Sequence, residues 1–216
     1  MSAPLDPFDY HAVQTYLETL VPPRPQELVA MEELARAVDF PIIGPVAGHY
    51  CYQVARMIGA RRIFEMGSGY GYSTAWFARA VRENGGGEVH HVVWNEQLSA
   101  QARSHLTALG VSDLIRFHVA EAVGALVQAD GPFDLIFMDI DKPAYPDALP
   151  HIAAKLRRGG VLIADNMLWH ARIFDLADRT VSTEAIRTLT RTLVEDAGWL
   201  TTLAPLRDGL IVAYRQ

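Results

Sequence analysis

Two short polar segments of this chain have the composition of a site that binds a cation and moves a proton. The first is Asp139-Ile140-Asp141-Lys142 and the second is Asp165-Asn166, and each directly follows an apolar run typical of a buried strand. If both strands lie in one parallel sheet, their carboxyl ends meet at the same edge and the polar side chains share a crevice. Carboxylate and amide oxygens are the ligands that magnesium or calcium prefers, and a nearby lysine can accept a proton from a polarised hydroxyl. The alternative is ordinary strand-end capping and surface ion pairing.

The pattern around these segments predicts an α/β fold. From residue 61 on, apolar runs of strand length alternate with segments of helical periodicity, as in a parallel sheet covered by helices on both faces. The predicted strands are residues 62–66, 89–94, 114–119, 133–138 and 160–164. The predicted helices are residues 73–82, 96–109, 121–127, 145–156 and a segment through Ile186, Leu189 and Leu193.

The two ends of the chain depart from this alternation. Three helices are predicted before the first strand, over residues 8–20, 26–38 and 48–58, with a turn-rich stretch at 40–45. At the other end, residues 199–203 and 210–214 flank a turn with Pro205 and Gly209, which predicts an antiparallel hairpin. We therefore expect a single domain over residues 1–216, with an N-terminal helical cap at 1–60 and an α/β core at 61–216. The core would hold five parallel strands plus the hairpin, seven in all.

Composition and charge narrow the classes of partner. The chain has 216 residues and a formal net charge of -6, so it has no basic field to hold nucleic acid or an anionic membrane. No apolar stretch approaches the roughly 20 residues that span a bilayer. The single Cys51 excludes an intramolecular disulfide, and the start of the chain lacks the basic and apolar regions of a secretion signal. We expect a cytoplasmic protein with a small-molecule substrate, no nucleic acid and no membrane association.

A glycine-rich turn, Glu65-Met66-Gly67-Ser68-Gly69-Tyr70-Gly71-Tyr72-Ser73, joins the first predicted strand to a helix. Glycines at such a place let the backbone approach a ligand at the helix N-terminus. The spacing differs from the dinucleotide fingerprint Gly-x-Gly-x-x-Gly, and the carboxylate of Glu65 would repel a pyrophosphate. It suits a cationic amine instead, such as that of S-adenosylmethionine (SAM). A plain tight turn is the alternative if this motif is taken alone.

Taken in order, the motifs resemble those of the cation-dependent class I O-methyltransferases, a family that includes catechol and caffeoyl-coenzyme A O-methyltransferases and many bacterial relatives. The glycine turn resembles motif I of class I methyltransferases, and the resemblance continues through residues 137–145, 159–169 and 207–210. It covers the chain from about residue 40 to its end. It implies a Rossmann-like class I methyltransferase fold, SAM as cofactor, and a divalent cation, with Mg²⁺ expected and Ca²⁺ or Mn²⁺ as alternatives. The implied substrate is a small catechol-like vicinal diol, and because relatives are often dimers, we expect a homodimer.

The resemblance also implies roles for individual residues. Asp139, Asp165 and Asn166 correspond to the metal ligands, and Lys142 corresponds to the general base. Three protein oxygens leave places in an octahedral shell for two substrate hydroxyls and a water. The positions that correspond to cofactor-binding residues are Ile43, Gly44, Glu65, Gly67, Gly69, Tyr70, Gly71, Ser73, Val93, Trp94, Glu121, Ala122 and Asp139.

Two of the implied roles have structural alternatives of similar weight. Glu121, with Ala122, corresponds to a segment beside the adenine, but it also suits a core position or a helix cap. Trp169 corresponds to an aromatic residue near the substrate ring, and a packed core tryptophan is an equal alternative.

One position departs from the family pattern. At the end of the second predicted strand the family carries an acid that holds the ribose hydroxyls, and this chain has Val93 there. Loss of that acid would weaken cofactor binding by about 2 to 3 kcal/mol, unless Asn95 or Glu96 substitutes for it. The alternative function is therefore a degenerate methyltransferase fold that binds a ligand or partner without turnover. A nicotinamide-dependent oxidoreductase is disfavoured by Glu65 and by the final hairpin.

Overall fold

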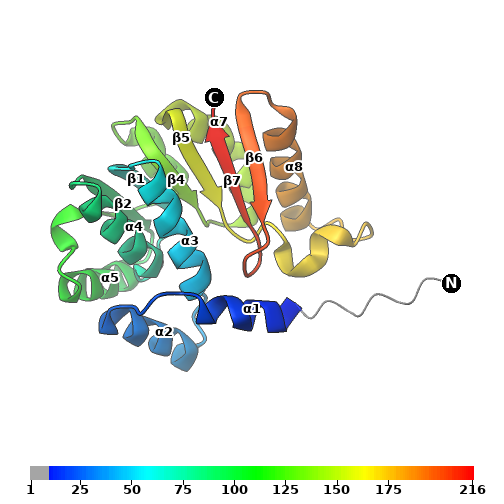
Figure 1. Ribbon diagram of the computed structural model, residues 1–216. Helices are drawn as coiled ribbons and strands as arrows, with labels where there is room; N and C mark the ends of the chain where they lie inside the picture. Colours follow the sequence, from blue (N-terminus) through cyan, green and yellow to red (C-terminus); the bar gives the residue numbers. More distant parts are fainter. Residues whose placement is uncertain (1–9) are drawn as a thin grey trace.

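In the computed structural model, which describes residues 10–216, the chain forms a seven-stranded sheet with helices on both faces (Figure 1). The strands are β1 (Arg62–Met66), β2 (Glu88–Val93), β3 (Ile115–Val119), β4 (Phe133–Met138), β5 (Leu156–Ala164), β6 (Trp199–Ala204) and β7 (Leu210–Arg215). Their order across the sheet is β3-β2-β1-β4-β5-β7-β6. Strands β1 to β5 pair in parallel, whereas β7 is antiparallel to both β5 and β6. The predicted sheet of five parallel strands and a C-terminal hairpin is confirmed.

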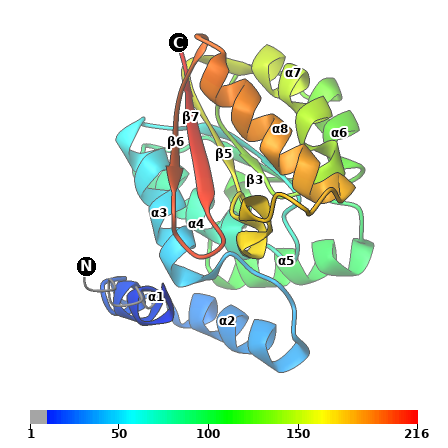
Figure 2. The ribbon, with the colours of Figure 1, turned by 90° about the vertical axis from the view of Figure 1, so that its right-hand side faces the viewer.

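Helices cover the two faces of this sheet in separate groups. The helices in the described part of the chain, including two that do not lie on the sheet, are α1 (Tyr10–Thr19), α2 (Gln26–Val38), α3 (Gly44–Met57), α4 (Tyr72–Glu83), α5 (Glu96–Ala108), α6 (Ala122–Gln128), α7 (Tyr145–Lys155) and α8 (Val181–Glu195). Short 3-10 segments are η1 (Ser112–Leu114), η2 (Lys142–Ala144) and η3 (Trp169–Phe174). Figures 1 and 2 show α3, α4 and α5 on one face and α6, α7 and α8 on the other. Of the helices between residues 10 and 216, none has the length and apolar character needed to cross a bilayer.

The core forms one apolar layer on each side of the sheet. Ile63, Leu135 and Ile163 belong to the layer under α3 and α4. Their chain neighbours Phe64 and Ile136 belong to the layer under α7 and α8. Successive side chains of a strand point to opposite faces, so a sheet covered on both sides needs continuous apolar runs. A polar segment cannot be covered by apolar layers on both sides, so each strand ends where such a segment begins.

Some element boundaries differ from the prediction. Helix α3 begins at Gly44 and not at residue 48, because a proline at position 45 suits the first helical turn, where a backbone N–H has no intrahelical partner. Strand β5 begins at Leu156, four residues before the predicted start, because Leu156 pairs with Phe133 of β4 beyond a register shift. The predicted first helix corresponds to α1, and its predicted start at residue 8 lies outside the described residues.

Hydrogen bonds tie the carboxyl ends of the central strands to one another. The N–H of Asp139, just after β4, donates to the carbonyl of Met66 in β1 at 2.9 Å, and that of Asp165, just after β5, donates to Met138 at 3.0 Å. The turn between β6 and β7 joins the same edge, since the N–H of Leu168 donates to the carbonyl of Asp208 at 2.8 Å. The segments after β1, β4 and β5 and the β6–β7 turn therefore meet.

Candidate active site

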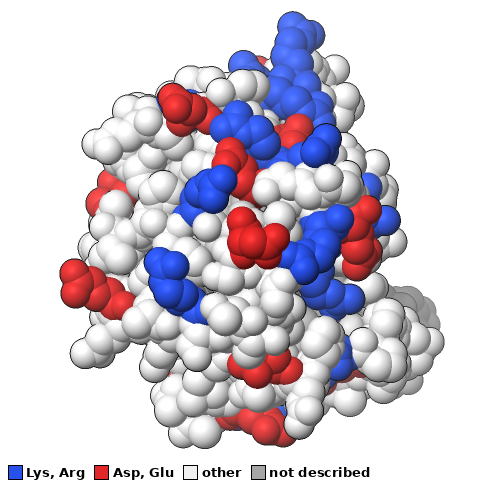
Figure 3. Space-filling view, turned by 90° about the vertical axis from the view of Figure 1, so that its left-hand side faces the viewer, with Lys and Arg blue, Asp and Glu red and all other residues white. Residues whose placement is uncertain are grey.

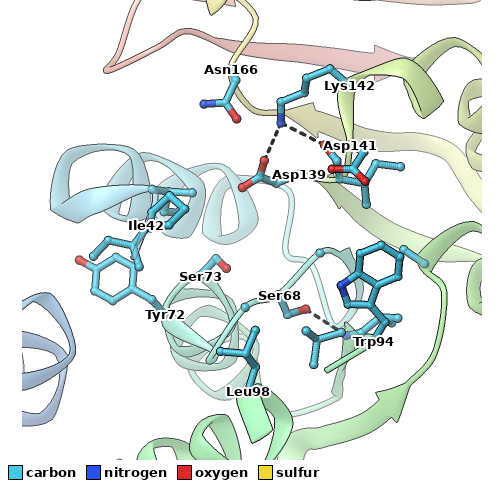
Figure 4. A pocket seen from close by; sticks show the side chains of 18 of the residues that line it. Ile42, Ser68, Tyr72, Ser73, Trp94, Leu98, Asp139, Asp141, Lys142 and Asn166 are labelled. Carbon is cyan, nitrogen blue, oxygen red and sulfur yellow. Dashed lines mark hydrogen bonds and ion pairs between the residues drawn. The ribbon is translucent and has the colours of Figure 1, made fainter. Parts of the chain in front are cut away.

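A cavity of about 730 Å³ opens where these strand ends meet. Its wall comes from the glycine turn, residues 40–43 and the segments that follow β2, β3, β4 and β5. Figure 4 shows Asp139, Lys142 and Asn166 gathered at one end of the cavity, with Trp94 and Leu98 at the other. We call these two regions the acid end, made of Asp139, Lys142, Asp165, Asn166 and Arg207, and the apolar end, made of Val93, Trp94 and Leu98.

The glycine turn and the acid end touch through a contact that only glycine permits. Gly67 has a φ of 86°, and a Cβ built on it would lie 2.0 Å from the carbonyl oxygen of Asp139. A side chain at this position would therefore push the turn after β1 away from the segment after β4. The close approach brings the backbone of the turn and the carboxylate of Asp139 onto the same cavity wall.

Lys142 is fixed in place by three oxygen atoms. Its Nζ donates to Asp139 Oδ1 at 2.8 Å, to the carbonyl of Ile140 at 3.1 Å and to the hydroxyl of Tyr145 at 2.8 Å. Tyr145 is fully buried, which raises its pKa well above its ordinary value, and its hydroxyl donates to the carbonyl of Asp165 at 3.0 Å. An ammonium has three N–H donors, and here each has an acceptor. Lys142, only 8% exposed, is thus a positive charge held against Asp139.

Asp165 lies behind the cavity wall and is fully buried. Its Oδ1 accepts from the backbone N–H of Asn166 at 2.7 Å, and its Oδ2 forms an ion pair with Nη2 of Arg207. Burial raises the pKa of this carboxyl, and the adjacent guanidinium opposes the rise. Asn166 itself lines the cavity, with a φ of 60° that asparagine tolerates, and its Nδ2 donates to Asp208 Oδ2 at 3.3 Å.

The residues of the predicted cation site therefore lie together at one edge of the sheet. Asp139, Asp165 and Asn166 supply the hard oxygen atoms that Mg²⁺ prefers, so the donor set fits this ion by its chemistry. Each carboxylate already has a cationic partner from the chain, Lys142 for Asp139 and Arg207 for Asp165. Among residues 10–216 no group of three or more His, Cys, Asp or Glu side chains is placed to hold a metal ion. A cation would have to rely on two carboxylates and one amide.

Arg207 is the member of the acid end to which we assigned no role from the sequence. It lies in the turn between β6 and β7, lines the cavity, and has a φ of 51°. Its position in a motif shared with the family was a signal that the turn is important. No local pattern, however, indicates toward which strand end a turn arginine extends.

The glycine turn forms a wall of the cavity, but its acid lies beneath it. Gly67, Ser68, Gly69, Tyr70 and Ser73 line the cavity. Glu65 is fully buried and accepts a hydrogen bond from the hydroxyl of Thr74, which also contacts Nδ1 of His91 at 3.0 Å. Burial raises the pKa of Glu65 to about 7, although the neighbouring hydroxyls of Ser73, Thr74 and Ser68 favour the ionised form. Glu65 therefore gains or loses its charge near neutral pH.

Three further predicted cofactor positions have backbone roles. Ile43 lines the cavity and is the N-cap of α3, whereas Gly44, the first residue of that helix, does not line it. Gly71 is the N-cap of α4 with a φ of 92°, and it is likewise absent from the cavity wall. These glycines shape the elements on either side of the cavity.

At the end of β2, neither Val93 nor the two residues proposed as substitutes presents an acid to the cavity. Val93 and Trp94 line the cavity, and Trp94 is 72% exposed at its rim. Asn95 is the N-cap of α5, and its Oδ1 accepts from two backbone N–H groups of the first turn, at 2.9 and 3.0 Å. Glu96 does not line the cavity. Asn95 therefore caps α5 and Glu96 is absent from the cavity wall, so neither takes the place of the acid.

Glu121 combines two roles. It is the N-cap of α6, where its carboxylate accepts from the N–H groups of Val123 and Gly124 at 2.8 and 2.7 Å, so the helix-cap alternative is confirmed. It also lines the cavity beside Ala122. Trp169 shows the same duality, because it lines the cavity and packs against the apolar layer under α7 and α8.

A sheet of this order, with a glycine turn after its first strand and acids after its fourth and fifth, is the fold of the class I methyltransferases. The chain matches the model of the O-methyltransferase family over residues 27–216, and it belongs to that family. A catechol O-methyltransferase of Mycobacterium tuberculosis is 31% identical over 180 residues, which cover 82% of this chain and 81% of the relative. The family and the enzyme class predicted from the motifs are confirmed.

Two solved structures resemble this one along nearly its whole length. An O-methyltransferase from Bacillus cereus, in complex with SAH, superposes with a TM-score of 0.85 at 26% identity and covers 95% of this chain and 97% of its own. TomG from Streptomyces achromogenes, an O-methyltransferase of tomaymycin synthesis in complex with SAM, superposes with a TM-score of 0.84 at 25% identity. That match covers 95% of this chain and 96% of TomG. Both comparisons agree with the predicted fold.

Proposed function

We propose that this protein transfers the methyl group of SAM to one hydroxyl of a small aromatic vicinal diol, with the help of a divalent cation. The observation that carries the proposal is the meeting of Asp139, Lys142 and Asn166 beside a glycine turn in one cavity. SAM or SAH in two similar structures, and a catechol O-methyltransferase among the relatives, support the choice of donor and acceptor. On the face shown in Figure 3, basic and acidic side chains are interspersed, which suits a small substrate.

The methyl donor would lie along the glycine turn. Its amino-acid part would face Gly67, Gly69, Tyr70 and Ser73, under the loop with Ile43 and Gly44, and its cationic amine would favour the ionised form of Glu65 below. Gly71 lies next to this wall as the N-cap of α4, in a left-handed conformation that glycine adopts readily. The nucleoside would extend to the apolar end, toward the positions that line it there, namely Val93, Trp94, Glu121 and Ala122.

The acceptor would lie at the acid end, where the proton has to leave its hydroxyl. A divalent cation, when held by Asp139, Asp165 and Asn166, would orient both hydroxyls of a catechol and lower the pKa of the reacting one. The oxygen then bonds to the methyl carbon as the carbon–sulfur bond breaks, and the sulfonium becomes a neutral thioether. Most of the rate gain would come from orientation and from charges already in place.

Lys142 would receive the proton after its ammonium has released one of its own protons to solvent through the cavity. A neutral amine keeps two N–H donors, which can retain the bonds to the carbonyl of Ile140 and the hydroxyl of Tyr145. Its lone pair would then point in the direction now taken by Asp139 Oδ1, a residue of the cavity wall. The two retained bonds would therefore hold the lone pair of Nζ toward Asp139 on the cavity wall, beside which the acceptor hydroxyl would lie.

The test is methylation of a catechol with SAM, in the presence of Mg²⁺ or of excess chelator. We expect chelation, or the Asp139→Asn variant, to lower turnover by about 10²-fold or more. Asp141→Asn is the matched control, because Asp141 lines the same cavity nearby but is exposed, whereas Asp139 is the acid bonded to Lys142. Undiminished turnover with chelator would refute the cation. If calorimetry detects no SAM binding, the alternative of a fold without turnover is favoured.

A further inference from the structure

The guanidinium of Arg207 stands at the oxygen atom that a cation would need. Its Nη2 pairs with Oδ2 of Asp165, while Oδ1 of the same carboxylate is taken by the backbone N–H of Asn166. Asp165 is fully buried, and a buried carboxylate requires a compensating charge. In the structure that charge comes from Arg207. A divalent cation at the same oxygen would be repelled by the guanidinium, since like charges a few ångströms apart in a half-buried site are weakly screened.

The backbone of Arg207 is hydrogen-bonded on two sides, so while these bonds are intact its charge can move only with the side chain. On one side, its N–H donates to Oε1 of Gln14 at 2.9 Å and its carbonyl accepts from the hydroxyl of Tyr10, both in α1. On the other, Asp208 and Gly209 accept backbone hydrogen bonds from the segment after β5, at 2.8 and 3.0 Å. The turn is therefore a fixed base for a long, flexible side chain.

The side chain is held less completely than its backbone. About a third of it, 33%, is exposed, which leaves a path to solvent. Its Nε is buried and finds no hydrogen-bond partner among the described residues. An unpaired buried donor is unfavourable, so withdrawal into water would satisfy Nε while it gives up the pair with Asp165. The arrangement is one that a stronger ligand of Asp165 can displace.

We propose that Arg207 is an internal counter-ion of Asp165 that competes with the divalent cation, so that binding of the cation requires the guanidinium to withdraw. This inference rests on the proposed cation site and adds its regulation. In the absence of the cation, Arg207 pairs with Asp165 and keeps the acid end assembled. The affinity for the cation is then lower than the three oxygen ligands alone would provide.

The experiment measures Mn²⁺ binding to the full chain by isothermal titration, with no cofactor or substrate present. Arg207→Met removes the charge and keeps much of the length. Arg207→Lys keeps the positive charge but replaces the planar guanidinium with an ammonium. Arg191→Met, an exposed arginine of α8 away from the cavity, makes the same change in net charge. We expect Arg207→Met to bind Mn²⁺ about ten- to hundredfold more tightly than wild type, because a charge-assisted pair no longer has to break. Arg207→Lys and Arg191→Met should stay near wild type.

Thermal unfolding of the same proteins, with and without Mn²⁺, is the second measurement. Arg207→Met should melt lower than wild type without the ion, since Asp165 has lost its counter-charge, and should gain more stability when the ion is added. This holds even if the variant is only partly folded without metal. Equal Mn²⁺ affinity and equal stabilisation in wild type and Arg207→Met would overturn the competition and leave the cation site standing. If neither protein binds Mn²⁺, the proposed cation site and the competition are both wrong.

Discussion

The acid end and the apolar end of the cavity differ in the kind of side chain that forms their walls. At the acid end the charged groups are paired in place, as in the bonds of Lys142 to Asp139 and of Arg207 to Asp165. At the apolar end the wall is Val93, Trp94 and Leu98, and the nearest polar side chain along the chain, Asn95, is used to cap a helix. The acid end thus presents charges that are already paired within the chain. The apolar end presents mainly contact and shape, because the acid that lines the cavity on that side, Glu121, is bonded to the first turn of α6.

The largest effect is expected at Lys142, a charged residue of the acid end with no counterpart at the apolar end. Replacement by methionine removes the proton acceptor and the partner of Asp139, so we expect kcat for methyl transfer to fall by about 10² to 10⁴. The apolar end is untouched, and the affinity for SAM measured by calorimetry should stay the same. Lys155→Met is the control, because Lys155 donates to the carbonyl of Ala129 away from the cavity. Normal turnover in Lys142→Met would contradict its role as base.

A smaller effect is expected from Glu65, the buried acid under the glycine turn. Its pKa is raised to about 7 by burial, whereas the unfolded chain ionises near the ordinary value for glutamate. Between these values the folded state binds the extra proton, so the free energy of unfolding falls as pH rises from about 4.5 to 7. In Glu65→Gln this loss is absent.

The measurement is urea unfolding of wild type and Glu65→Gln at several pH values from 5 to 8. Relative to wild type, the variant should gain stability as pH rises, by about 2 to 3 kcal/mol over this range. Parallel curves would contradict the raised pKa and would indicate that Glu65 is ionised throughout.

The smallest effect is expected from giving the apolar end an acid. Val93→Glu places a carboxylate at the end of β2, on the cavity wall. If the nucleoside lies there, its ribose hydroxyls gain an acceptor, and SAM should bind about tenfold more tightly in calorimetry. Val93→Gln is the matched control for the added size and should gain less. Weaker or unchanged binding in both variants would place the ribose elsewhere.

Much of the acid end could be predicted because it depends on two simple rules. Asp139 and Asp165 follow continuous apolar runs, and parallel strands bring their carboxyl ends to one edge. Arg207 could not be assigned a role in the same way, because its partner lies 42 positions away along the chain. Its direction depends on how the β6–β7 turn packs against the segment after β5.

The apolar end shows a different limit. Asn95 stands directly before a helix, where asparagine is a favoured N-cap. From the sequence alone it could therefore be either a helix cap or a substitute for the missing acid. The structure decides for the cap, since two backbone N–H groups bond to its oxygen. The start of β5 at Leu156 was missed for another reason. The predicted helix ran through residue 156, and Arg157-Arg158-Gly159 lacks an apolar strand pattern, but pairing with β4 makes this segment part of the strand.

Helix α1 makes the acid end sensitive to events at the far end of the chain. None of its residues is buried, so little apolar contact holds it, and a ten-residue helix has little stability of its own. Such an element is the first to open in local unfolding, and its amides should exchange with solvent well before those of the sheet. Each opening would release the tether of Tyr10 and Gln14 on the Arg207 turn. If Arg207 competes with a cation as proposed, a tag or fusion partner joined to the N-terminus would therefore alter the affinity for that cation some distance from the point of attachment.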